Sequence, residues 1–96
     1  MDKLIKNLIE IVEPLTKDET IPEDIRGTII SGYNILTDIN KGNRERIQLS
    51  CDIFDDAQYE AYNPFHARVQ LSKAIAIQEQ FTGKQFERTK KSKLTN

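Results

Sequence analysis

Residues 21–26 read IPEDIR, and residues 63–68, which stand 42 positions later, read NPFHAR. In each stretch an arginine follows the proline by four positions. Proline suits the first turn of a helix, because the backbone N–H that it lacks has no partner there. We therefore expect Pro22 and Pro64 to be the first residues of two equivalent helices, the second of them capped by Asn63.

An acidic residue also precedes each proline by four positions. An arginine one turn inside a helix opposes the helix dipole, and a nearby carboxylate would offset this. We expect each arginine to reach back to its own acid and to tie a helical hairpin together. The alternative is that the two guanidinium groups form a fork for an anionic ligand. The residues of these two turn sets are Asp18, Pro22, Arg26, Glu60, Pro64 and Arg68.

The matched stretches belong to a longer internal repeat. A shift of 42 places residues 2–38 over residues 44–80, so that Ile5 meets Ile47 and Ile11 meets Ile53. The apolar positions recur at helical spacing throughout, and no alternating run indicates a strand. Two such hairpins bury their apolar stripes only against each other, which predicts an all-α, four-helix up-and-down bundle. A two-repeat fragment of a solenoid is the alternative, although such arrays usually need three or more repeats.

Turn-forming residues mark the ends of the expected helices. Pro14 should end or kink the first helix. The sequence NKGN at 40–43 predicts a stop after the second helix, with Asn40 or Gly42 in the left-handed conformation, and Asn43 as the cap of the third helix. Gly83 is a stop signal for the fourth helix.

The length of 96 residues fits one domain, and the hydrophobic fraction of 38% predicts a thin core. We assign residues 1–83 to the bundle and residues 84–96 to a basic C-terminal extension. The expected stripe of the third helix consists of Ile47, Cys51, Phe54 and Ala57. The expected stripe of the fourth helix consists of Ala67, Leu71, Ala74, Ile75 and Phe81.

The charge is unevenly distributed along the chain. Five basic residues against Glu87 give residues 84–96 a balance of +4, and the total of −1 then leaves −5 for residues 1–83. The sequence shows no signal peptide and no apolar run of membrane-spanning length, and Cys51 alone forms no internal disulfide. We expect a cytoplasmic protein that does not enter a membrane. The basic residues are Lys84, Arg88, Lys90, Lys91 and Lys93.

Two stretches resemble a known family. DETIPEDIR (18–26), followed by CDIFDDAQYEAYNPFHAR (51–68), is similar to the signature of archaeal uncharacterised protein family 0147. The likeness extends over about residues 4–82. The chain departs from the family pattern at residues 60–62, at Gly27 and after Arg68. The resemblance implies a small all-helical archaeal protein and no assigned activity.

Acidic residues are most dense around the end of the expected third helix. Asp52, Asp56 and Glu60 are spaced four residues apart and share one helix face, with Asp55 beside them. Carboxylates in this arrangement suit a divalent cation or acid–base chemistry. The calcium-loop pattern and the Glu-x-x-His pair of di-iron bundles are both absent, which favours a solvated face or a patch for a basic partner.

The sequence contains no catalytic motif. His66 is the only histidine, and we expect it to pair with Glu60 or Asp56 across the adjacent turn. Neither a nucleophile elbow nor a metal-binding pair accompanies it. Cys51 lies on the apolar stripe and is expected to pack as a small hydrophobe. We therefore expect no enzymatic activity and no cofactor.

The composition favours a non-enzymatic protein-interaction or assembly module. Four aliphatic residues fall off the main stripes, which predicts burial against a partner and hence a homodimer or other homo-oligomer. The alternative is a nucleic-acid or ribonucleoprotein accessory that uses the basic extension, with Phe86 available for stacking. The four aliphatic residues are Ile30, Ile35, Leu49 and Ile77.

Overall fold

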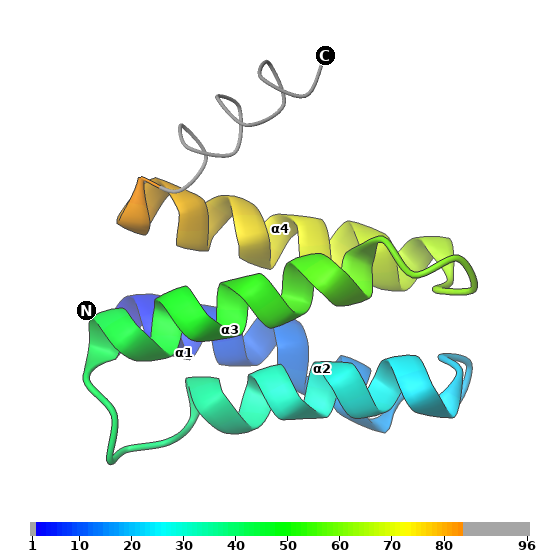
Figure 1. Cartoon of the computed structure of the whole chain (residues 1–96), viewed down its shortest axis with the longest axis horizontal. Helices are drawn as coiled ribbons and strands as arrows, with labels where there is room; N and C mark the ends of the chain where they lie inside the picture. Colours follow the sequence, from blue (N-terminus) through cyan, green and yellow to red (C-terminus); the bar gives the residue numbers. More distant parts are fainter. Residues whose placement is uncertain (1, 84–96) are drawn as a thin grey trace.

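The computed structural model describes residues 2–83 and shows an all-helical bundle in that part of the chain (Figure 1). A short 3₁₀ segment, η1, continues the first helix. The described residues contain no strand. The expected four-helix, all-α fold is confirmed. Its elements are α1 (Asp2–Val12), η1 (Glu13–Lys17), α2 (Glu23–Leu36), α3 (Asn43–Gln58) and α4 (Phe65–Thr82).

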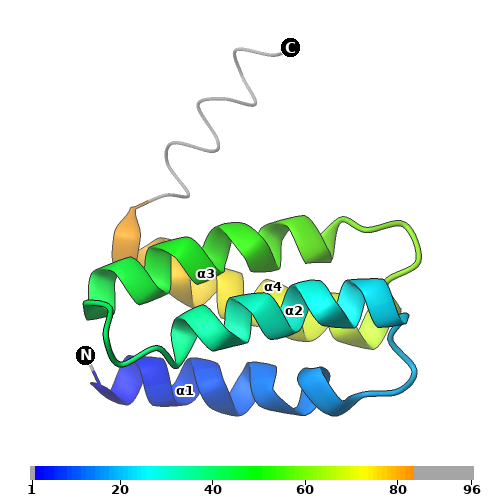
Figure 2. The same ribbon diagram turned by 60° about the horizontal axis from the view of Figure 1, so that its bottom comes forward.

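The four helices form a closed ring of neighbours. α2 packs against α3, α3 against α4, and α4 against α1, while α1 and η1 pack against α2. Figures 1 and 2 show consecutive helices running in opposite directions. The connections before α2 and before α4 lie at the same end of the bundle, and the connection between α2 and α3 lies at the other end (Figure 2). This arrangement brings the connections before α2 and before α4, which are far apart in the sequence, to the same end of the bundle.

The core contains the stripes that the periodicity predicted. The expected residues of α3 are fully buried, and the α4 stripe is buried apart from Phe81, which packs at its edge. The core residues are Ile5, Leu8, Val12, Leu15, Ile21, Ile25, Ile29, Leu36, Ile47, Cys51, Phe54, Ala57, Ala67, Leu71, Ala74 and Ile75.

α2 and α3 approach each other closely at Gly32. A Cβ atom built on Gly32 would lie 2.9 Å from Cδ1 of Phe54, which is shorter than real Cβ contacts allow. Both residues are buried. Gly32 therefore provides the space that the ring of Phe54 occupies between the two helices.

Pro22, Gly42 and Pro64 occupy the cap positions of α2, α3 and α4. Their φ angles are −51°, −65° and −58°, and their ψ angles are 143°, 154° and 150°. The extended ψ keeps each residue outside the helix, although its carbonyl oxygen accepts the first helical hydrogen bond. The expectation that the prolines are the first helical residues, with Asn43 and Asn63 as caps, is therefore wrong by one position each.

The predicted helix ends are confirmed at Pro14 and Gly83, whereas the left-handed conformation predicted at Asn40 or Gly42 is wrong. α1 ends at Val12, and Pro14 lies in η1, as expected of a residue that interrupts the α-helical bonding. Gly83 caps α4 in the left-handed conformation with φ of 74°, which confirms its role as a stop. Asn40 and Gly42 do not adopt this conformation, since Gly83 is the only residue with positive φ in the described range. α2 instead ends at Leu36 through a hydrogen-bonded turn.

Candidate functional site

The three connections between the α-helices share one plan of backbone hydrogen bonds. In each connection, the backbone N–H of an acidic residue donates to the carbonyl of the residue three positions before it, at the end of the preceding helix. The carbonyl of that acidic residue accepts from the N–H of the residue three positions after it. The cap residue follows at once, and its carbonyl accepts from the N–H of an arginine four positions later. The five positions involved are 15, 18, 21, 22 and 26; 35, 38, 41, 42 and 46; and 57, 60, 63, 64 and 68.

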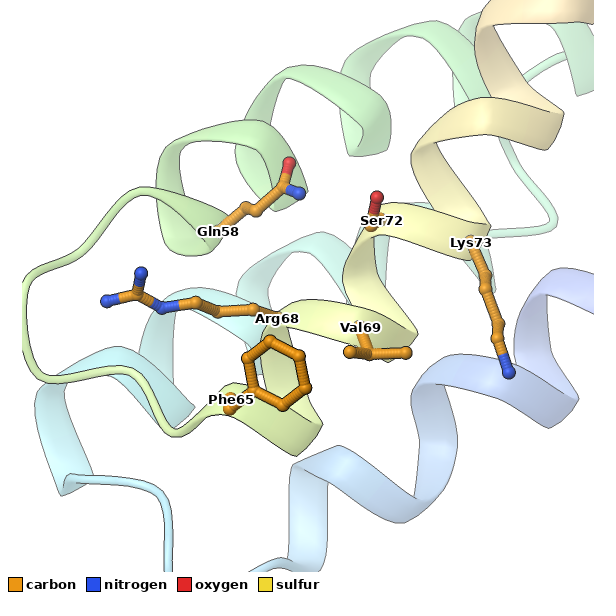
Figure 3. Close-up of a pocket in the computed structure, with 6 residues that line it drawn as sticks. All are labelled: Gln58, Phe65, Arg68, Val69, Ser72 and Lys73. Carbon is orange, nitrogen blue, oxygen red and sulfur yellow. The ribbon is translucent and has the colours of Figure 1, made fainter.

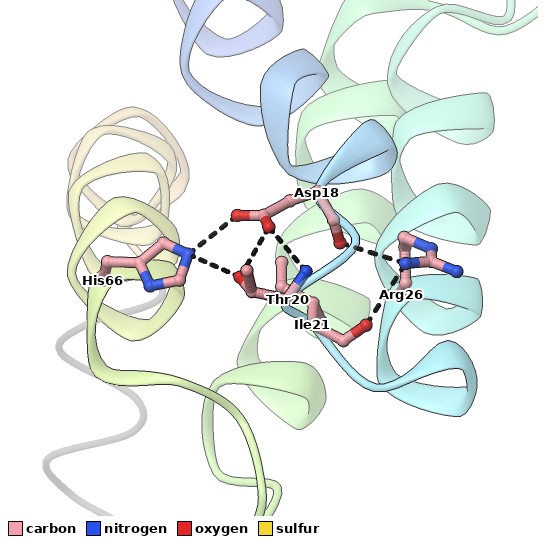
Figure 4. A network of polar contacts seen from close by, with 5 residues as sticks. All are labelled: Asp18, Thr20, Ile21, Arg26 and His66. Atoms are coloured by element: carbon pink, nitrogen blue, oxygen red, sulfur yellow. Dashed lines mark hydrogen bonds and ion pairs between the residues drawn. The ribbon is translucent and has the colours of Figure 1, made fainter.

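Arg26 binds the first connection through backbone carbonyl groups. Its Nη1 donates to the carbonyl oxygens of Asp18 at 3.0 Å and of Ile21 at 3.3 Å (Figure 4). We expected the guanidinium to reach the carboxylate of Asp18, but that carboxylate points to the other side of the connection (Figure 4). The arginine therefore ties the hairpin together by binding two carbonyl groups of the connection itself.

Arg68 repeats this arrangement 42 positions later. Its Nε donates to the carbonyl of Asn63 at 2.9 Å, and its Nη2 donates to the carbonyls of Glu60 and Ala61, both at 3.1 Å. Here too the guanidinium binds main-chain oxygen where we expected the carboxylate of Glu60. Each arginine is held within its own connection, an arrangement unlike the shared anion fork that we considered as the alternative.

Arg46 is the equivalent residue of the second connection, which the 42-residue repeat did not reveal. Its Nε donates to the carbonyl of Leu36 at 2.8 Å, and its Nη1 donates to Oδ1 of Asn43 at 3.1 Å. The signal was present in the sequence. An acid, three residues, Pro or Gly, three residues and Arg occur at 18–26, 38–46 and 60–68.

The carboxylate of Asp18 joins the two hairpins. His66, at the start of α4, places Nε2 at 2.7 Å from Oδ2 of Asp18 and at 3.3 Å from Oγ1 of Thr20 (Figure 4). Thr20 donates to the other carboxylate oxygen of Asp18 through both its backbone N–H at 2.9 Å and its hydroxyl at 2.6 Å. We expected His66 to pair with Glu60 or Asp56 instead. That expectation is wrong, because the ring of helices places the first connection beside His66, where Asp18 and Thr20 contact Nε2.

Hydrogen bonding sets the acidity of Asp18. The hydroxyl of Thr20, the imidazole of His66 and the backbone N–H of Thr20 together lower the pKa of Asp18 to about 2. All three contacts favour the ionised carboxylate. The side chain of His66 is half exposed, and the pair becomes an ion pair when the imidazole is protonated.

This network has the composition of a catalytic triad but a different geometry. In a triad the carboxylate binds Nδ1 of the histidine, and the hydroxyl binds Nε2. Here the carboxylate of Asp18 and the hydroxyl of Thr20 both face Nε2 of His66. Moreover, the hydroxyl of Thr20 donates a hydrogen bond to the carboxylate of Asp18. The geometry suits a structural link between connections better than nucleophilic catalysis.

The acidic residues of α3, and Glu60 in the connection that follows it, are not buried. Asp52, Asp56 and Glu60 are exposed, and Asp55 is half buried. No group of three or more metal-binding side chains converges within residues 2–83. Cys51 is buried in the core, as expected. In the same range, no helix is long and apolar enough to cross a membrane.

A surface groove lies beside the N-terminal half of α4. It has a volume of about 360 Å³ and is lined by six residues, shown in Figure 3: Gln58, Phe65, Arg68, Val69, Ser72 and Lys73. Phe65 and Val69 lie next to each other in this view, whereas Arg68 extends toward the connection that precedes α4 (Figure 3). Phe65 is 80% exposed, and Tyr62 in the connection is 83% exposed. Sequence analysis did not single out these apolar residues.

The basic residues of the C-terminal extension, Lys84, Arg88, Lys90, Lys91 and Lys93, lie outside the described residues. The structure therefore leaves the assignment of residues 84–96 to a separate extension as a prediction.

Comparison with known proteins identifies the family. No curated protein and no solved structure matches the chain. The model of the uncharacterised protein family UPF0147 matches residues 1–81, a range that includes all three connections and nearly all of α4. The chain therefore belongs to the uncharacterised protein family UPF0147.

Proposed function

We propose that this protein is a non-enzymatic protein-interaction module that binds its partner through the α4 surface, which we define as Phe65, Val69, Ser72, Lys73 and Ala76. All five residues are exposed. They stand at positions 65, 69, 72, 73 and 76, a helical spacing that places them on one side of α4. The buried apolar residues of α4, Ala67, Leu71, Ala74 and Ile75, face the core instead.

The observation that carries this proposal is the contrast between α4 and the other helices. A surface helix normally turns charged or polar residues toward solvent. α1, α2 and α3 do so with Lys3, Lys6, Glu10, Glu23, Asp24, Arg44, Glu45, Asp52 and Asp56. On α4 the exposed positions are mostly uncharged, with Lys73 as the one exposed Lys, Arg, Asp or Glu; they are Phe65, His66, Val69, Ser72, Lys73, Ala76 and Gln80. The only acid of α4, Glu79, is buried. Such a face suits burial against another protein.

The aliphatic residues that first suggested a partner contribute less than expected. Ile77 packs against the core, and Ile30 and Ile35 are half buried within the bundle. Leu49 is exposed but lies on α3 among charged residues. The interaction surface that we propose therefore rests on α4, not on these four residues.

Affinity capture from the native host tests this proposal. The tagged full-length chain is compared with Phe65→Ser and with Ile39→Ser, a matched control, since Ile39 is 85% exposed in the connection at the other end of the bundle. We expect Phe65→Ser to lose bound proteins, including untagged copies of the same chain, that Ile39→Ser retains. Equal capture by all three chains would contradict the proposal.

A nucleic-acid accessory that uses residues 84–96 stays a second prediction, because their balance of +4 suits phosphate binding. A mobility-shift titration at two salt concentrations, with the full chain and with Lys90→Glu/Lys91→Glu, tests it. Unchanged binding by the variant would eliminate this role for the basic extension.

A further inference from the structure

Resting on the proposed function, we infer that the partner is a second copy of this chain, and that the two copies pack their α4 helices antiparallel about a two-fold axis at Val69. The inference names both the occupant of the α4 surface and the register in which it binds. Three features of α4 support this inference. They are the spacing of its exposed apolar residues, the complementarity of Phe65 to Lys73, and the lack of an ion-pair partner for Lys73 in the described part of the chain.

The exposed residues of α4 have the spacing of a helix-packing seam. Phe65, Val69, Ser72 and Ala76 follow at intervals of four, three and four residues. This alternation is the one with which two helices pack side by side. The side chains of Ser72 and Ala76 are small, and therefore let a second helix approach closely.

Phe65 and Lys73 of the α4 surface become partners when the two helices run in opposite directions about Val69, and this register sets Ser72 and Ala76 opposite positions 66 and 62. With the two-fold axis at Val69, residues equally distant on either side of it face each other. Phe65, four positions before Val69, then meets Lys73 of the partner subunit, four positions after it. An ammonium group over an aromatic ring is a favourable contact. The two-fold axis produces this contact twice.

The charges of the surface favour a second copy over a nucleic acid. Lys73 forms no ion pair with another residue in the described part of the chain. The other cation of the groove, Arg68, donates three hydrogen bonds to the connection before α4. One available cation on a body with a balance of −5 is a poor match for a polyphosphate backbone. The ring of Phe65 on a second copy provides a favourable contact for Lys73 and needs no acidic residue.

The exposed area predicts a weak dimer. A buried aromatic side chain removes roughly 150–250 Å² from water, and Phe65 and Tyr62 are both about four-fifths exposed. With Val69 and Ala76, each copy would bury on the order of 400–500 Å², or about 800–1,000 Å² in total. Since this is below the size of standard stable interfaces, we expect dimerisation at micromolar concentrations.

Cysteine cross-linking tests the register. A short bis-maleimide is applied to full-length Val69→Cys, Gln80→Cys and Ile39→Cys, and to the parent chain, whose Cys51 is buried. In the antiparallel register, Val69 meets its own counterpart, whereas two copies of Gln80 are separated by 22 helical positions, about 33 Å along the axis. We expect efficient cross-linking of Val69→Cys alone. Comparable cross-linking of Gln80→Cys would indicate a parallel or non-specific contact and would overturn the inference.

Sedimentation across a concentration series measures the association itself. We expect Val69→Asp to raise the dissociation constant at least tenfold, and Lys73→Glu, which removes two cation–π contacts per dimer, to raise it by about five- to thirty-fold. Ile39→Asp should leave it unchanged. A monomer at high micromolar concentration, or an RNA oligonucleotide whose binding is lost in Val69→Asp, would overturn the inference.

The two proposals fail differently. If the chain stays monomeric and Phe65→Ser still removes captured proteins, the second-copy partner is wrong and the interaction module stands. If the chain is monomeric and capture is also unaffected by Phe65→Ser, both proposals are wrong.

Discussion

The imidazole Nε2 of His66 lies 2.7 Å from Oδ2 of Asp18, although the two residues are 48 positions apart in the chain. His66 is the second residue of α4, and Asp18 belongs to the connection before α2. The contact therefore links the two pseudo-equivalent hairpins at the end of the bundle where their own connections lie (Figures 2 and 4).

Asp18→Asn should reduce stability in a pH-dependent way. The pKa of Asp18 is lowered to about 2 in the folded protein, against about 3.9 in an unfolded chain. A lowered pKa contributes stability that is fully present above about pH 4 and is lost as the pH falls toward 2. Because the pair lies near the surface, we expect a loss of about 1 kcal/mol at pH 6. Urea unfolding followed by circular dichroism measures the difference between wild type and variant, which should shrink between pH 4 and pH 2.

Asp38→Asn is the matched control for this experiment. Asp38 holds the equivalent position in the second connection and accepts a hydrogen bond from the N–H of Asn40, but its ion-pair partner is the nearby Lys41 instead of a residue of the other hairpin. We expect His66→Ala to reduce the effect of Asp18→Asn and to leave that of Asp38→Asn unaltered. Equal effects of His66→Ala on both would mean that the contact between hairpins contributes nothing measurable.

Replacement of Arg46 by Gln should destabilise the fold by about 1–2 kcal/mol, because a charged donor that satisfies a helix-end carbonyl is lost. The same change at Arg26 and Arg68 should have a similar effect, since each of the three residues donates to backbone carbonyl oxygen at its own connection. Arg44→Gln is the control. Arg44 is exposed on the same helix, and its guanidinium lies 5.9 Å from the centre of the ring of Phe81. Thermal unfolding that ranks Arg44→Gln with the other three would show that the shared connection plan has no special energetic role.

Gly32→Ala and Gly27→Ala should change stability in opposite directions. Both glycines lie inside α2, where alanine is favoured over glycine by about 1 kcal/mol. At Gly27 nothing lies within 4 Å of an added Cβ, so the substitution should stabilise the protein. At Gly32 the added atom would collide with Phe54, and the overpacking cost of about 1–3 kcal/mol should exceed the gain. Urea titration of the pair checks this, and stabilisation by Gly32→Ala would contradict the close packing of α2 on α3.

Gln78→Ala should weaken the contact between α3 and α4. The side chain of Gln78 is fully buried, and its Nε2 donates to the carbonyl of Ile47 at 3.1 Å and to Oγ of Ser50 at 2.8 Å. Its removal leaves a cavity and two lost hydrogen bonds, for which we expect about 2–3 kcal/mol. Hydrogen exchange should speed up most in the facing part of α3. Gln80→Ala, an exposed change on the same helix, should have little effect on either measurement.

The helical architecture was predictable because its signals are local. Apolar residues at helical spacing identified the buried stripes of α3 and α4 correctly, and the repeat of 42 residues matches connections that have the same hydrogen bonds. Helix starts were displaced by one residue, since Pro22 and Pro64 have the φ of a helix but the ψ of an extended chain. Whether a proline is the cap or the first helical residue depends on the turn that precedes it, not on the proline itself.

The role of the arginines was predicted only in part. Their placement one turn inside the helices follows from spacing, but their partners are carbonyl groups, whose positions depend on how the preceding helix ends. The pattern of an acid, a proline and an arginine did not include Arg46, because glycine holds the position of the proline in the second connection. A pattern that allows Pro or Gly would have found all three.

The amino-acid sequence by itself determined where the chain is helical, which side of α3 and α4 is buried and where the connections lie, because these properties depend on residues within a few turns of one another. Only the tertiary structure decided the partner of His66 and the character of the α4 surface. Both depend on the closure of the helix ring, which places the first connection against the start of α4 and leaves Phe65 and Val69 on the outside. Such contacts join residues that are distant in the chain, so that no local pattern specifies them.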